Sequence, residues 1–497
     1  MVSFYRPTVR FIGGKKLKDR FCKKQGLSDY LFVSEKERGI LMNTNRKTKQ
    51  DNLDNLFSTL AEKKQFNGTI LVAEKGEIIY KEAFGFADFK TERKLTSHSI
   101  FDLASVSKAF TAMGVIILQE QGKLSYDDPV KNYIPELPYP GITIRHLLQH
   151  TSGLPDYMSF FLKQGDRSKF VTNKDVLDML KKYQPPVRFQ PNEQWEYGNT
   201  GYILLALLTE RVSGMSYADF LQTEIFQPLG MQHTRVYNRR YSREIIEDYA
   251  YGHVYSAESN TYELPDHVPS VDYVVFLDGV QGDGAISSNV DDMLRWDRAL
   301  YTDKLVKKTT LEEAFRPVKL NNQETFDYGF GWLLPKDQTG GRIVSHSGGW
   351  PGYHTYFIRY IDADKTIICL NNIEQDTAFE QMILAEVDNI LFERPYTIPA
   401  SPPAEEAAVE IDTTVYSQYT GTYQLSPEAE IEVTQKEARL FFQLPVLSMT
   451  ELLPLSETRF FPRATFDQVE FIRNASGKAT DMILYSSGQS SKAVRIQ

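Results

Sequence analysis

Apolar and polar residues alternate through FNGTILVAEKGEIIYKEAFG, residues 66–85, on both sides of Lys75 and Gly76. Strands repeat with a period of two, and a Lys-Gly pair between two alternating runs is typical of a tight turn. This stretch therefore predicts a β-hairpin. Immediately before it, Leu53, Leu56 and Leu60 have helical spacing, which predicts a helix over 51–64 with Asp51 as a candidate cap.

A different pattern follows in FDLASVSKAFTAMGVIILQEQG, residues 101–122. Apolar residues fall on almost every side of a helix here, which predicts a buried helix rather than a surface one. Ser105, Ser107 and Lys108 stand at its beginning. Because burying an unpaired ammonium group is costly, Lys108 must find partners elsewhere in the chain.

Strand character returns in GGRIVSHSG, YHTYFIRYI and KTIICLNN, between residues 340 and 372, whereas 101–300 consists mostly of helical patches. An amphipathic helix follows Asp376, its candidate cap, with one apolar face formed by Phe379, Met382, Ile383, Val387, Ile390 and Leu391. We expect an α+β layer with a large helical insertion, and a ligand cleft between the two lobes.

The chain divides into four parts by composition. Residues 1–50 form a basic extension that we expect to be poorly ordered, and 51–394 form the main domain. Residues 395–410 are a linker rich in Pro, Ala and Glu. Short strand-like runs over 411–497 predict a separate small antiparallel domain, a barrel or a sandwich, and of the two we expect the β-barrel.

The 497 residues carry a net charge of −9, which divides into +9 for residues 1–50 and −18 for the remainder. An acidic body argues against nucleic-acid binding, and a solvated tail explains the basic segment better than a nucleic-acid or membrane arm. No apolar run is long enough to span a bilayer, and no secretory signal is visible, so the cytoplasm is the default location. Cys22 and Cys369 are too few for a disulfide framework, and Cys369 fits core packing better than a nucleophile.

Ser105 and Lys108 are three residues apart, which places both side chains on one helix face. A hydroxyl at a helix start lies near backbone N–H groups that favour a developing oxyanion, and a lysine in an apolar cleft is a candidate base. The alternative is that Ser105 caps the helix and Lys108 extends to solvent.

Tyr197 and Asn199 precede a second apolar helix that we expect to begin near Thr200. A nearby lysine would favour the phenolate of Tyr197 as a general base, and the Asn199 amide could bond Lys108 and a substrate carbonyl. The alternative is a Tyr-Gly-Asn turn that caps the helix.

A short strand precedes His346, Ser347, Gly348 and Gly349. Glycines here allow close approach of a ligand, and the Gly349 N–H could join that of Ser105 in an oxyanion hole. His346 could orient an acyl carboxylate or tune the tyrosine. The alternative is a glycine-rich turn with an incidental histidine.

The order Ser-x-x-Lys, Tyr-x-Asn, His-x-Gly resembles the penicillin-recognising serine hydrolases: class C β-lactamases, D-alanyl-D-alanine carboxypeptidases, D-aminopeptidases and related esterases. ITIRHLLQHTSGLPDY, PLGMQHT, GDGAISSNVDDMLRW and YGFGW are similar to connecting segments of that family, and the likeness runs from about residue 51 to 392. It implies an antiparallel sheet flanked by helices, a helical lobe, and an acyl-enzyme on Ser105. It also implies activation by Lys108 and Tyr197, acyl-group binding by Asn199, and His346, Gly348 and Gly349 on the opposite wall. The base, Lys108 or Tyr197, stays open.

The resemblance has departures that bear on the substrate. A typical class C β-lactamase has lysine and threonine where this chain has His346 and Ser347, so the expected activity is hydrolysis of a small ester, amide or D-amino-acid peptide bond. The alternative is a module that binds penicillin or cell-wall peptides with poor turnover. The resemblance to this family also gives a periplasmic or extracellular location as the alternative to the cytoplasm.

We expect no cofactor and no metal, and as partner a small-molecule or short-peptide substrate, with no nucleic acid and no integral membrane segment. His146 and His150 have the spacing of a metal pair, but no acidic residue accompanies them as a metalloprotease requires, so hydrogen bonding is the favoured role. Asp283, Asp291 and Asp292 are interpreted as caps and turn residues. The aromatic loops over 155–195 and 235–275 form either a pocket wall or the core of the helical lobe.

Overall fold

The computed structural model describes residues 35–256, 258–336, 341–400, 407–426, 429–444, 449–463, 465–486 and 489–497, with side chains from residue 45 onward. Cys22 and most of the basic N-terminal extension lie outside these residues. Among those described, no helix has both the length and the apolar character needed to cross a bilayer.

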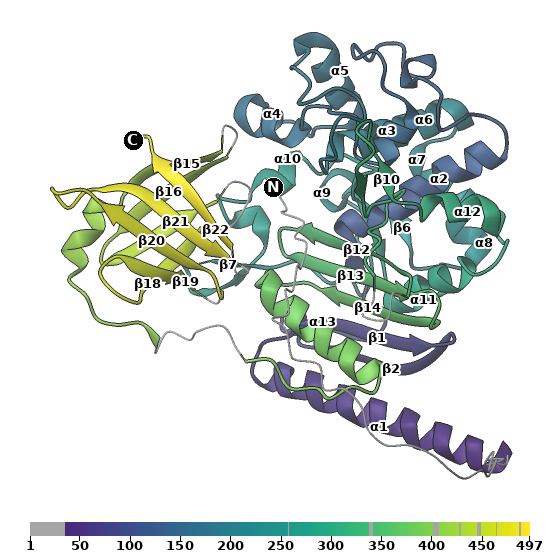
Figure 1. The fold of residues 1–497 in the computed structure, drawn as a ribbon, viewed down its shortest axis with the longest axis horizontal. Helices are drawn as coiled ribbons and strands as arrows, with labels where there is room; N and C mark the ends of the chain where they lie inside the picture. The colour runs from purple at the N-terminus through teal and green to yellow at the C-terminus, as the bar shows by residue number, and fades with distance from the viewer. Residues whose placement is uncertain are drawn as a thin grey trace, which may run out of the picture.

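A five-stranded antiparallel sheet forms the centre of the main domain (Figure 1). Its strand order is β12-β13-β14-β1-β2, so β1 from the start of the domain pairs with β14 from its end. The strands are β1 (Gly68–Glu74), β2 (Glu77–Phe84), β12 (Ile343–Trp350), β13 (Tyr353–Tyr360) and β14 (Lys365–Asn371). The expected hairpin is β1 and β2, and Lys75 and Gly76 both turn with positive φ, as a type I′ turn requires.

Two helices cover one face of this sheet, α1 (Glu35–Glu62) and α13 (Thr377–Leu391). The predicted start of the first helix is wrong, because α1 runs through Asp51 rather than beginning there. Asp376 does cap α13, accepting the Phe379 N–H. Met382 is 37% exposed and departs from the expected apolar face.

The helical lobe covers the other face, with α2 (Lys108–Glu120) through its middle. Every residue from Lys108 to Leu118 is buried, as the pattern predicted. The other helices of the main domain are α3 (Ile144–Leu148), α4 (Tyr157–Gln164), α5 (Asn173–Tyr183), α6 (Asn199–Ser213), α7 (Tyr217–Leu221), α8 (Gln227–Leu229), α9 (Arg239–Ser242), α10 (Tyr273–Phe276), α11 (Val290–Ala299) and α12 (Lys308–Ala314).

Short strands join these parts. The three-stranded sheet β5-β9-β6 leads into α2. The short strands are β3 (Phe86–Asp88), β4 (Arg93–Lys94), β5 (Phe101–Asp102), β6 (Arg235–Val236), β7 (Val254–Ser256), β8 (Thr261–Glu263), β9 (Ile286–Ser288), β10 (Val318–Lys319) and β11 (Thr325–Phe326). Cys369 is buried in β14, and burial raises the pKa of its thiol well above the ordinary value, which agrees with core packing.

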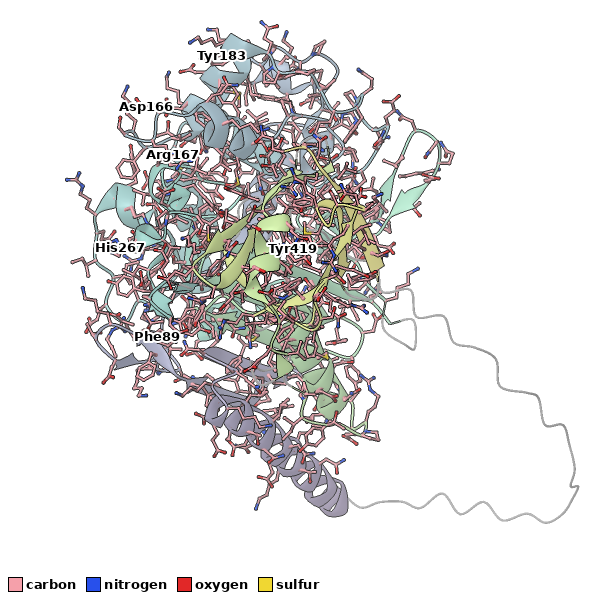
Figure 2. The ribbon with its side chains drawn as sticks, turned by 90° about the vertical axis from the view of Figure 1, so that its left-hand side faces the viewer. Phe89, Asp166, Arg167, Tyr183, His267 and Tyr419 are labelled. Atoms are coloured by element: carbon pink, nitrogen blue, oxygen red, sulfur yellow. The ribbon has the colours of Figure 1, made fainter. Side chains whose placement is uncertain are left out.

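The C-terminal domain is a closed antiparallel β-barrel of eight strands in sequence order, which confirms the predicted barrel. Its strands are β15 (Gly421–Ser426), β16 (Ala429–Lys436), β17 (Arg439–Gln443), β18 (Thr450–Pro454), β19 (Arg459–Pro462), β20 (Gln468–Arg473), β21 (Ala479–Ser486) and β22 (Gln489–Arg495). Buried aromatic side chains fill it, among them Tyr419 stacked on Phe471 at 4.5 Å between ring centroids. Figure 2 views the barrel in front of the main domain, with Tyr419 labelled in it.

The barrel packs against the main domain near the start of α13. Phe466 of the barrel contacts Phe379 with ring centroids 6.3 Å apart, and Lys436 pairs with Glu258 at 2.6 Å. Residues 401–406 of the expected linker lie outside the described residues.

Candidate active site

Ser105 lies in a 3₁₀ turn, Ala104–Ser107, between β5 and α2. Ala104 has a positive φ of 46°, which costs energy in a residue with a side chain, and its N–H donates to Asp102 Oδ1 at 2.8 Å. The residue that precedes α2 is Ser107, and no side-chain capping bond closes either helix start. Ser105 is therefore not a helix cap, and the turn presents its side chain to the pocket.

Lys108 is fully buried and does not reach solvent. Its Nζ donates to Ser105 Oγ at 3.0 Å and to the main-chain oxygen of Asp283 at 2.7 Å. It also lies 4.9 Å from the ring centroid of Tyr197. Burial lowers the pKa of Lys108 to about 8, against the opposing pull of the Asp283 and Asp156 carboxylates. These contacts explain how a core helix tolerates a lysine.

The partners of Lys108 differ in part from those expected. Asn199 is not among its hydrogen-bond partners in the structure, and the Asp283 carbonyl takes that place. Sequence reasoning had grouped Asp283 with caps and turn residues. A main-chain carbonyl leaves no side-chain signature, so no motif could have revealed this partner.

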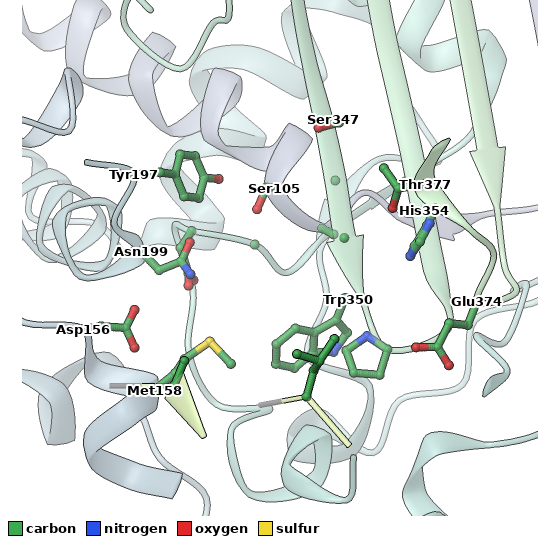
Figure 3. A pocket seen from close by; sticks show the side chains of 18 of the residues that line it. Ser105, Asp156, Met158, Tyr197, Asn199, Ser347, Trp350, His354, Glu374 and Thr377 are labelled. Carbon is green, nitrogen blue, oxygen red and sulfur yellow. The ribbon is translucent and has the colours of Figure 1, made fainter. Parts of the chain in front are cut away.

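Tyr197 and Asn199 flank Gly198, the residue before α6, and no side chain caps this helix. Burial raises the pKa of the Tyr197 phenol well above its ordinary value, although a hydrogen bond with Ser105 works to lower it. A favoured phenolate requires a lowered pKa, so the expectation that Lys108 would make Tyr197 a phenolate is wrong. Figure 3 shows Ser105 between Tyr197 and the strand of Ser347, with Asn199 on the Tyr197 side.

His346, Ser347, Gly348 and Gly349 lie inside β12 rather than after it, and β12 is the edge of the sheet. Ser345 exchanges both main-chain hydrogen bonds with Leu333 on the outer side, at 2.8 and 3.0 Å. Since backbone direction alternates along a strand, the N–H of Gly349 points to the same open edge. Gly349 and Ser105 both line the pocket.

His346 is buried, with both ring nitrogens bonded to protein groups. Its Nδ1 lies 2.6 Å from the main-chain oxygen of Ser347, and its Nε2 lies 3.1 Å from the Tyr328 hydroxyl. Burial, helped by the nearby Lys108, lowers the pKa of His346 to about 3. The imidazole is therefore neutral at ordinary pH.

The pocket is a cleft of about 2790 Å³ lined by both domains. Asp156, Met158 and Trp350 line the same pocket as Ser105 (Figure 3), and the barrel contributes Tyr485 and Arg463. The aromatic loops serve both expected roles: Tyr157 and Tyr273 line the cleft and are also buried in the core of the lobe.

The remaining candidates are structural. His146 Nδ1 accepts the Thr143 N–H in a capping box, while His150 bonds Gly198 and Tyr328. The favoured hydrogen-bonding role of the two histidines is confirmed. In the part of the chain that the structure describes, no group of three or more His, Cys, Asp or Glu could hold a metal ion.

Asp291 and Asp292 lie in the first turn of α11. Asp291 pairs with Lys81 at 3.1 Å, and Asp292 accepts the His233 N–H at 2.8 Å. Both carboxylates thus hold neighbouring segments together, and the interpretation of these two residues as caps or turn residues is wrong, because Asn289 is the cap of α11.

Comparisons with known proteins identify relatives of this chain. The chain is 51% identical to Penicillin-binding protein 4* of Bacillus subtilis (strain 168), over 90% of this chain and 99% of that protein. A D-aminopeptidase of Brucella anthropi is 26% identical over 64% of this chain, which spans 59% of that relative. The crystal structure of a penicillin-binding protein from Bacillus halodurans superposes with a TM-score of 0.58 at 25% identity, over 67% of this chain and 98% of that one.

Two family matches divide the chain. Residues 405–495 match a domain of unknown function (DUF3471), which is the barrel. Residues 53–389 match the family described as Beta-lactamase, so the resemblance seen in the motifs is confirmed. The penicillin-binding and D-aminopeptidase homologues support a function of the serine hydrolase type. The chain belongs to the beta-lactamase family.

Proposed function

We propose that this protein is a serine hydrolase that forms an acyl-enzyme on Ser105 and cleaves a small ester, amide or D-amino-acid peptide bond. One observation carries the proposal: the amine of the fully buried Lys108 lies 3.0 Å from Ser105 Oγ, which lines the cleft. A buried lysine loses much of its preference for the charged form, and its pKa of about 8 makes the neutral amine accessible near neutral pH.

In the first step the neutral Lys108 amine takes the Ser105 proton while Oγ attacks the substrate carbonyl carbon. The main-chain N–H groups of Ser105 and Gly349 stabilise the oxyanion that forms. The Tyr197 phenol, which is protonated before the reaction, passes its proton to the leaving group, and the Lys108 ammonium then reprotonates it. The carbon–leaving-group bond then breaks, and the acyl ester remains on Ser105.

Deacylation reverses these roles. A water molecule attacks the acyl carbon, its proton passes to Lys108, and the Ser105 oxygen leaves with a proton from the same pair of residues. Asn199, at the first position of α6 and on the pocket wall, binds the acyl side chain. His346 supports this wall through its protein partners, and Gly348 lets β12 approach the Ser105 turn.

Intact-protein mass spectrometry tests the nucleophile. We expect one adduct after brief incubation with a fluorophosphonate, and one with a penicillin, on the wild-type protein but not on Ser105→Ala. Persistence of the adduct in Ser105→Ala would exclude Ser105 as the nucleophile.

A second candidate is a module that binds penicillin or cell-wall peptides with poor turnover, favoured by the similarity to a protein named as penicillin-binding. Burst kinetics with an activated ester separate the two. Sustained turnover after the burst supports the hydrolase, and a burst of one equivalent that then stalls supports the binding module.

A further inference from the structure

A buried tyrosine hydroxyl bridges two histidines beneath the candidate active site. The Tyr328 hydroxyl lies 3.0 Å from His150 Nε2 and 3.1 Å from His346 Nε2. All three side chains are at least 97% buried. Tyr328 belongs to the segment between β11 and β12, whereas His150 follows α3, so the bridge joins three separate segments.

Two main-chain groups fix the protons of this chain of hydrogen bonds. The Gly198 N–H donates to His150 Nδ1 at 3.2 Å, so that nitrogen carries no proton and Nε2–H must donate to Tyr328. At the other end the Ser347 carbonyl can only accept, so His346 Nδ1 carries the proton. His346 Nε2 is then bare and accepts the Tyr328 proton.

Tyr202 also lies beside the Tyr328 hydroxyl, but its own hydroxyl donates to the Leu148 carbonyl at 2.8 Å. It supplies no proton to the chain. The unprotonated imidazole nitrogen of His346 is a better acceptor than the phenol oxygen of Tyr202. The Tyr328 hydroxyl therefore donates to His346. Burial and Lys108 lower the pKa of both histidines, which keeps each imidazole neutral with the single proton that the chain requires.

The two ends of this chain of hydrogen bonds, Gly198 and Ser347, belong to the two opposite walls of the site. Gly198 stands between Tyr197 and Asn199 and precedes α6. Ser347 is two residues before Gly349 on β12. In Figure 3 the Ser105 side chain lies between Tyr197 and the strand that carries Ser347.

We propose that Tyr328, held by His150 and His346, is a positioning residue that fixes the Tyr197-Gly198-Asn199 turn and the oxyanion strand β12 at their working separation. The proposal rests on the function proposed above. Tyr328 is not among the residues that line the cleft, and it acts through the two histidines on the main-chain groups of Gly198 and Ser347. A shift of about 1 Å between reacting groups can lower a rate by about 100-fold.

The first experiment reads the tautomers directly, independently of any catalytic activity. Protein labelled with ¹⁵N-histidine, with signals assigned by His150→Gln and His346→Gln, should show His150 as the Nε2–H form and His346 as the less common Nδ1–H form. Neither should titrate between pH 5 and 8. A titrating His346, or an Nε2–H form of it, would overturn the proposal.

The second experiment measures acylation by an activated ester in Tyr328→Phe, with Tyr139→Phe as the matched control. The Tyr139 hydroxyl is also buried and donates to the Pro185 carbonyl, but it is not among the residues that line the cleft. We expect the acylation rate constant to fall about 10- to 100-fold in Tyr328→Phe, with the dissociation constant for the non-covalent complex changed less than about 3-fold, and Tyr139→Phe to acylate normally.

Equal acylation rates in the two variants would contradict the positioning role. If the Tyr328→Phe variant remains folded, the ¹⁵N signals of His346 should also change, because its Nε2 loses the Tyr328 hydroxyl as hydrogen-bond donor. If the wild-type protein forms no adduct at all, the proposed function fails, while the tautomers still decide whether the chain exists.

Discussion

A β-carbon added to Gly348 would lie 2.2 Å from the main-chain oxygen of Leu103, two residues before Ser105. It would also lie 2.3 Å from Thr355 Oγ1, whose hydroxyl donates to that same Leu103 oxygen at 2.8 Å. No side chain fits between β12 and the turn that carries Ser105. The absence of a side chain at Gly348 therefore determines how closely β12 approaches the turn that carries Ser105.

Gly348→Ala should lower the acylation rate by about 100-fold or more, because the added methyl group displaces β12 from the Ser105 turn. Gly349→Ala is the matched control, since its β-carbon would meet nothing within 4 Å and the N–H is retained. Acylation kinetics with an activated ester compare the two. Equal losses in both variants would show that the packing against Leu103 does not set the geometry.

The acylation rate should rise with pH to a plateau above about 9, with an apparent pKa near 8, because Lys108 accepts the Ser105 proton only when neutral. The raised pKa of Tyr197 keeps it protonated over that range. The pH profile of kcat/KM for a neutral ester measures this limb. A rate independent of pH between 6 and 9 would exclude Lys108 as the base.

Lys108→Arg should reduce acylation by about 10²- to 10⁴-fold and remove the rise with pH, because a guanidinium does not lose its proton in this range. The same profile, recorded on the variant, checks this. If the acylation rate of Lys108→Arg still rose with pH, the titrating group would be a residue other than Lys108.

Asp297→Ala should destabilise the main domain by about 3–5 kcal/mol, because it leaves the Arg359 guanidinium buried without its charge partner. The two are bonded at 2.5 Å with almost no exposure. Arg342→Ala removes exposed pairs with Glu312 and Asp362 and should cost less than about 1 kcal/mol. Denaturant unfolding measures both, and similar losses would contradict the contrast.

Asp467→Asn should stabilise the contact between the two domains above pH 6, by less than about 1 kcal/mol. Burial and then Asp467 raise the pKa of Asp376 to about 6, and burial also raises that of Asp467. When folding raises the pKa of a carboxyl, the free energy of unfolding falls as the pH rises from about 4 to 6, where the group ionises. Removing the charge of Asp467 therefore stabilises the protein only above this pH range.

Thermal unfolding at pH 4 and pH 8 tests this effect. The wild type and Asp467→Asn should coincide at pH 4 and differ at pH 8. Asp481→Asn is the control, because Lys492 lowers the pKa of that exposed carboxylate and its loss should slightly destabilise the barrel at pH 8. Identical shifts in the two variants would refute the pairing of Asp376 with Asp467.

Much of the fold follows from periodicity alone. Alternation and a Lys-Gly turn were enough to predict β1 and β2, and the all-round apolar pattern predicted α2. The start of α1 was not predictable, because the helix residues before Asp51 are polar apart from the single run Ile40-Leu41-Met42 and show no apolar period. Met382 was placed on the wrong face because spacing cannot tell the edge of an apolar face from its centre.

The candidate site was predictable in its side chains and not in its backbone. Ser105, Lys108, Tyr197 and Gly349 could be found because their types and order carry the chemistry. The positive φ of Ala104 and the Asp283 carbonyl depend on packing between distant segments, which no local pattern records. The direction of the Tyr197 pKa was missed because burial outweighs the effect of a lysine that is itself partly neutral.

The pairing of β1 with β14 has a consequence for synthesis of the protein. Gly68 is opposite Asn371, so the ribosome must release about three hundred residues between the first strand and its partner. Closing so long a segment makes the sheet a late and slow event, whereas the barrel pairs strands in sequence order. Since β12 adds to that same sheet, a nascent chain carries Ser105 long before it carries the strand opposite, and the cleft that both line is incomplete until the domain has closed.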